Sequence, residues 1–140
     1  MTSSEALMPI EYYEAPDVKI LVDEIIKMLN FKHVEANRVF CFRSQGSQSR
    51  RVIARIHSLE KVWQKALNTR AGYLIEVISE RFDGLEQRER EKVLIHELLH
   101  IPAGFSGGFR PHKGYINNRI LDKLHQEYMN SRNSRKCIDS

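Results

Sequence analysis

Two histidines and a glutamate near residue 100 are the side chains of this sequence best suited to chemistry. His96 and His100 lie four positions apart, with Glu97 directly after the first, so the segment reads His-Glu-x-x-His. On a helix this spacing places both imidazoles on one face, one turn apart, where they can bind the same metal ion. Glu97 then lies beside the metal and can hold a water molecule instead of ligating. The pattern predicts a zinc-dependent hydrolase.

A catalytic zinc ion usually takes three protein ligands and keeps one position for water. His112 is the strongest candidate for the third ligand, because it lies in a glycine-rich loop, 103–114, that can fold back over the end of the motif helix. Arg110 and Tyr115 flank His112 and are the candidate donors to the oxyanion of a tetrahedral intermediate. The competing third ligands lie on the next predicted helix: Asp122, His125 and Glu127.

The motif itself is expected at the end of a helix. Residues 85–92 are rich in Glu, Arg and Gln, the run becomes apolar from Val93, and Pro102 stops it. Apolar residues at helical spacing predict three more helices. These are 17–30 with Asp17 as N-cap, 59–68 with Val62, Trp63 and Leu67 on its buried side, and a last helix over 116–128.

The strands are expected upstream of the motif. Residues 39–42 and 52–57 are β-rich and are separated by a Ser/Gln/Gly segment, which suggests a hairpin over 39–57. The segment Tyr73–Ser79 has the clearest strand pattern in the chain. Because it directly precedes the motif helix, it is the candidate edge for pairing with an extended substrate.

Length and composition favour one domain. At 140 residues the chain is long enough for one core, so we expect a flexible segment over 1–16, a single domain over 17–130 and a polar tail over 131–140. No apolar run approaches the roughly 20 residues that cross a bilayer. Residues 1–9 lack the pattern of a secretory signal, so we expect a cytoplasmic protein without a membrane partner.

The charge balance allows a second kind of partner. The net charge is +4, and the densest basic cluster contains Arg43, Arg50, Arg51 and Arg55. Such a cluster permits weak contact with nucleic acid, although a solvated loop with flanking arginines is the simpler interpretation.

The region from the motif to His112 carries a resemblance to a known family. His96–Pro102, followed by Phe105–His112, resembles the putative phage metallopeptidase family of phage and archaeal proteins. Three upstream stretches fit the same pattern: 43–47, 54–56 and 62–64. The family is similar to SprT-like minimal zincins. The resemblance implies an α+β, minimal zincin-like domain, in which a small mixed or antiparallel sheet packs against the HExxH helix and flanking helices. It also implies Zn2+ bound by His96, His100 and His112, with Glu97 catalytic.

These observations predict a zinc metallopeptidase that hydrolyses peptide bonds with a zinc-activated water and Glu97 as general base. Two alternatives stay open. One is a nucleic-acid-associated, SprT-like protease, which the basic cluster suggests. The other is a non-enzymatic zinc-binding module, in which a fourth ligand such as His125 or Glu127 closes the site.

Overall fold

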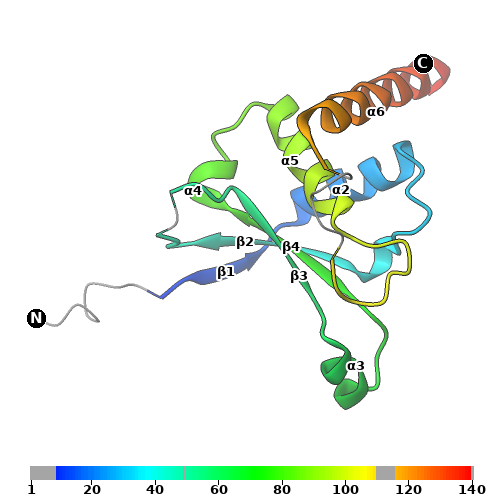
Figure 1. The fold of residues 1–140 in the computed structure, drawn as a ribbon. Coiled ribbons are helices and arrows are strands. Elements are labelled where there is room, and N and C mark those ends of the chain that lie inside the picture. The colour runs from blue at the N-terminus through cyan, green and yellow to red at the C-terminus, as the bar shows by residue number, and fades with distance from the viewer. Residues whose placement is uncertain (1–8, 49, 110–115, 140) are drawn as a thin grey trace, which may run out of the picture.

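A four-stranded mixed sheet is the centre of the fold (Figure 1). The computed structural model describes residues 9–48, 50–109 and 116–139. The strands are β1 (Glu11–Glu14), β2 (Val39–Gln45), β3 (Ala54–Ser58) and β4 (Tyr73–Ile78), and their order across the sheet is β1-β2-β4-β3. β2 and β4 are parallel, whereas β1 and β3 are antiparallel to their neighbours.

The larger helices lie together on one face of this sheet (Figure 1). They are α2 (Pro16–Met28), α5 (Gln87–Leu99) and α6 (Asn118–Asp139). α2 contacts β2, α5 contacts β3, and α6 packs against both helices. The short elements are a 3-10 turn, η1 (Ala36–Arg38), and the helices α3 (Lys61–Leu67) and α4 (Ser79–Phe82). Within the described residues, no helix is long and apolar enough to span a membrane.

The core follows from the two periodicities of the sequence. On β4, the alternate residues Tyr73, Ile75 and Val77 are at most 1% exposed and face the helices. The helices contribute apolar residues at three- and four-residue spacing, which bring one face of each helix onto the sheet. These residues are Val18, Val22 and Ile25 of α2, and Leu94, Ile95 and Leu98 of α5. The predicted α+β class with a small mixed sheet is therefore confirmed.

The predicted hairpin over 39–57 is wrong. β2 and β3 do not pair with each other, because β4 lies between them and pairs with both. All but one residue of β4 are buried, which suits a central strand with a parallel neighbour. The proposed substrate edge at Tyr73–Ser79 is wrong for the same reason. The free edge next to α5 belongs to β3.

Two helix predictions also need correction. α2 begins with Ala15 at the N-cap and Pro16 in its first turn, so Asp17 is inside the helix. α3 forms where expected, but the side predicted to be buried is exposed: Val62 is 68% accessible, Trp63 55% and Leu67 58%. The helix lies beyond the ends of β3 and β4, where no large helix covers it (Figure 1).

The described parts of the two terminal segments are more regular than expected. β1 forms within the segment 1–16, for which no element was predicted, and it pairs with the end of β2. α6 continues through most of the segment 131–140 and ends at Asp139.

Candidate active site

The last turn of α5 carries the His-Glu-x-x-His motif. The apolar face of the helix, with Leu94, Ile95 and Leu98, is buried in the core, while His96 and His100 lie on a half-buried side. Their ring centroids are 5.2 Å apart and the ring planes differ by 35°. His100 is the C-cap residue, and its N–H donates to the Glu97 carbonyl at 3.1 Å. The predicted placement of two imidazoles on one face is therefore present.

This arrangement fits a shared metal ion. Zinc binds imidazole nitrogen at about 2.0–2.1 Å, so two nitrogens on one tetrahedral ion lie about 3.4 Å apart. Rings separated by 5.2 Å between centroids can each direct one nitrogen to such an ion. Among residues 9–48, 50–109 and 116–139, no group of three or more side chains of the metal-binding types is found. The predicted third ligand, His112, and its neighbours Arg110 and Tyr115 lie outside the described residues.

Two of the three competing third ligands on α6 have other partners. His125 is 7% exposed, and its Nε2 lies 2.8 Å from Glu91 Oε1 on α5. Asp122 forms an ion pair with Lys92 at 2.8 Å, at the rim of a hollow that His96 also lines. Glu127 is exposed. His125 thus joins α5 to α6, and Asp122 lines a hollow together with His96.

The Glu97 side chain is buried, with only 7% exposure. Burial disfavours its charged form and raises the pKa of Glu97 to about 7. A carboxyl group with this pKa can both accept and release a proton near neutral pH, which is what a general base that later acts as an acid requires.

The loop after the motif is fixed to the start of β4. The Tyr73 hydroxyl accepts a hydrogen bond from the Gly107 N–H at 3.1 Å and donates one to the Gly108 carbonyl at 3.0 Å. The Phe105 ring packs on Tyr73 with 5.0 Å between centroids. Sequence reasoning missed this role of Tyr73. The alternation of the strand indicates that the ring is buried, but it does not indicate which backbone the hydroxyl reaches.

The free edge of the sheet lies beside α5, on β3. Two hydrogen bonds set its pairing with β4: Ile78 N–H to Ile53 O, and Leu59 N–H to Gly72 O, each at 2.9 Å. Bonded and non-bonded residues alternate along an antiparallel pair. The backbone N–H and C=O groups of three β3 residues therefore point away from β4: Ala54, Ile56 and Ser58.

Comparison with known protein families gives a match that spans the sheet and the motif helix. The family described as putative phage metallopeptidase matches residues 10–131, from the first strand into the last helix. The chain belongs to this family. No match is found among curated proteins or among solved structures. Membership in the phage metallopeptidase family indicates a peptidase that uses a metal ion and acts on protein substrates.

In this family member the predicted basic cluster is only partly available. Arg43 donates to Asp17 at 2.7 Å and to Asp83 at 2.9 Å, so it clamps α2 to the end of α4. Arg50 and Arg51 are exposed, and Arg55 is half-buried. Contact with nucleic acid through this cluster stays a prediction.

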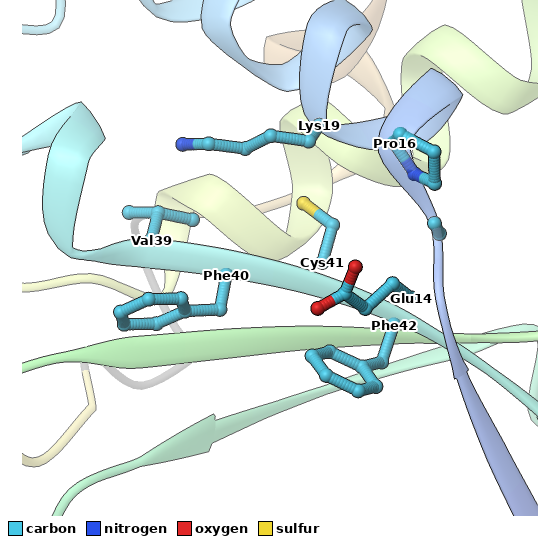
Figure 2. Close-up of a pocket in the computed structure, with 8 residues that line it drawn as sticks. Glu14, Pro16, Lys19, Val39, Phe40, Cys41 and Phe42 are labelled. Atoms are coloured by element: carbon cyan, nitrogen blue, oxygen red, sulfur yellow. The ribbon is translucent and has the colours of Figure 1, made fainter.

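A second hollow lies at the opposite side of the sheet from β3, around the start of α2. Figure 2 shows Phe40 and Phe42 on one side of β2 and Cys41 on the other, as strand alternation requires. Burial raises the pKa of the Cys41 thiol to about 12, so the thiolate that binds metals or attacks carbonyls is scarce. Cys41 is therefore a small buried apolar residue of the core.

Proposed function

We propose that this protein is a zinc-dependent peptidase whose centre is the last turn of α5. His96 and His100 would hold the zinc ion together with His112, and Glu97 would be the catalytic base. The observation that carries the proposal is the combination on one helical turn of two imidazoles 5.2 Å apart and a buried carboxyl group with a pKa raised to about 7.

A zinc ion bound there would acidify a water molecule and polarise the substrate carbonyl. Glu97 accepts the proton of the attacking water and passes it to the leaving amine. Its burial favours the protonated carboxyl group that forms after the first step. Arg110 and Tyr115 are proposed as donors to the developing oxyanion.

The substrate would bind in extended form along β3. The outward N–H and C=O groups of Ala54, Ile56 and Ser58 can form an antiparallel ladder with a peptide, and α5 contacts this strand directly. Recognition through backbone hydrogen bonds would make extended, unfolded segments the preferred substrates.

Metal content and hydrolysis of an unfolded protein would test this proposal together. We expect about one zinc ion per chain in the wild type, much less in His112→Ala, and an unchanged content in the control His57→Ala. The control is matched because His57 lies on the strand next to the site but pairs with Glu76 at 2.8 Å. Glu97→Gln should keep zinc and lose hydrolysis.

Two results would contradict the proposal. Wild-type protein without metal after zinc is supplied would refute the metal site. Full zinc with no hydrolysis in the wild type, and loss of zinc in a His125 or Glu127 variant, would instead support the closed, non-enzymatic module.

A further inference from the structure

Helix α3 exposes a cluster of apolar side chains. None of its seven residues is buried, and Val62, Trp63 and Leu67 are 68%, 55% and 58% exposed. On a helical wheel these three lie within an arc of about 140°. Gln64, whose side chain bonds to the body of the protein, lies outside this arc. We call these three residues the α3 patch. Large apolar side chains exposed together on one side of a helix are typical of interaction sites.

α3 is nevertheless tied firmly to the candidate active site. Gln64 Nε2 donates to the Leu59 carbonyl at 2.8 Å and to the Ser106 carbonyl at 3.1 Å, so it joins the helix to the loop after the motif. Gly107 adopts φ +103°, and a Cβ there would lie 3.1 Å from Gln64 Nε2 and 3.3 Å from the Leu59 carbonyl. The close contact between this loop and α3 therefore depends on a glycine.

The position of α3 indicates which part of a substrate would reach it. The helix begins at Lys61, directly after the free strand β3 ends at Ser58. A peptide that pairs antiparallel with β3 runs in the opposite direction, so its N-terminal residues leave the strand beside α3 (Figure 1).

The charges of α3 indicate what such a segment would contain. The helix carries two charged residues, Lys61 and Lys65, and both are exposed. Neither forms an ion pair within the described part of the chain. Acidic residues next to an apolar side chain would complement this surface.

We propose that α3 is a secondary docking site for protein substrates, which binds a segment N-terminal to the scissile bond through large apolar side chains flanked by acidic residues. The inference rests on the proposed function, because it is the substrate paired with β3 that brings this segment to the α3 patch.

Trp63 makes the test direct, because it is the only tryptophan of the chain. Its emission would be followed in Glu97→Gln, which cannot cleave the probe, during titration with a short peptide of alternating Leu and Glu residues. We expect a saturable blue shift as the indole leaves water. Two matched peptides, with Lys in place of Glu or Ser in place of Leu, should produce no saturable shift over the same concentrations.

Variants locate the binding. Val62→Ser with Leu67→Ser, made in the Glu97→Gln background, should weaken binding of the Leu/Glu peptide by roughly tenfold while the tryptophan still reports. Ile20→Ser is the matched control, because Ile20 is 69% exposed on α2, away from β3. The proposal is overturned if the tryptophan emission does not respond to the peptide. It is also overturned if Val62→Ser with Leu67→Ser binds the peptide as tightly as the parent and Ile20→Ser do.

Cleavage of the same peptide by wild-type protein, followed by mass spectrometry, separates the two proposals. A saturable shift in Glu97→Gln supports docking whether or not wild-type protein cuts the peptide. Cleavage by the wild type without a tryptophan response would overturn the docking site and leave the peptidase activity standing.

Discussion

The buried Glu97 carboxyl should make the metal-free protein less stable at high pH. Its pKa is raised in the folded protein from 4.5 to about 7, so between these values the folded state binds more protons than the unfolded state. The free energy of unfolding therefore falls as pH rises through this window. The destabilisation due to Glu97 is largest above about pH 7.

The magnitude follows from the shift. A rise of about 2.5 pKa units lowers the free energy of unfolding by about 3.4 kcal/mol at high pH. About 2.5 kcal/mol of this loss develops between about pH 5 and about pH 8. Glu97→Gln removes this titration. The difference in free energy of unfolding between Glu97→Gln and wild type should therefore shift by about 2.5 kcal/mol in favour of the variant when the pH is raised from about 5 to about 8.

The assay is denaturant unfolding at both pH values in the presence of a chelator. Comparing the two pH values cancels any pH-independent cost of burying an amide. Glu127→Gln is the control, because that glutamate is exposed on α6 and should show no such difference. An equal effect of Glu97→Gln at both pH values would refute the reasoning that burial controls this carboxyl group.

Three further predictions concern stability and binding. Glu91→Ala should lower the free energy of unfolding by about 3 kcal/mol, because it leaves His125 and Arg132 without their buried carboxylate partner; denaturant unfolding measures this, and a loss below about 1 kcal/mol would contradict it. Gly107→Ala should cost about 1–2 kcal/mol, since it combines a positive φ with the contact to Gln64, and a neutral effect in thermal unfolding would count against that contact. Ser58→Pro removes an outward N–H of β3, so it should reduce kcat/KM about tenfold with little change in Tm; an unchanged kcat/KM would exclude that amide from substrate binding.

Local sequence patterns predicted much of the fold and the centre of the candidate site. The spacing of His96 and His100 within a helical pattern was enough to place both rings on one side of α5. The apolar run of β4 was recognised as a strand, and α2, α3, α5 and α6 were located near their observed positions. These features depend on neighbours a few residues apart, so the sequence itself contains the information.

The errors arose where the answer depends on distant contacts. Nothing local to 39–57 shows that β4 separates β2 from β3, so the pairing and the free edge were both misassigned. The helix predicted at α3 is present. Periodicity cannot reveal, however, that the sheet does not extend far enough to cover Trp63. The link from Glu91 to His125 joins residues 34 positions apart on two helices, and no spacing rule connects them.

The strand order has a consequence for how the chain folds. β2 gains its parallel partner only from residues 34 positions later, and β1 pairs with β2 across a similar separation. Among the described strands, no sequential pair closes as a tight hairpin, so the sheet depends on loop closures that are costly in entropy. We therefore expect β4 to be the organising element of the transition state, and substitutions there to slow refolding more than they speed unfolding. The segment that carries the motif follows β4 directly, so it would dock onto a sheet that is already assembled.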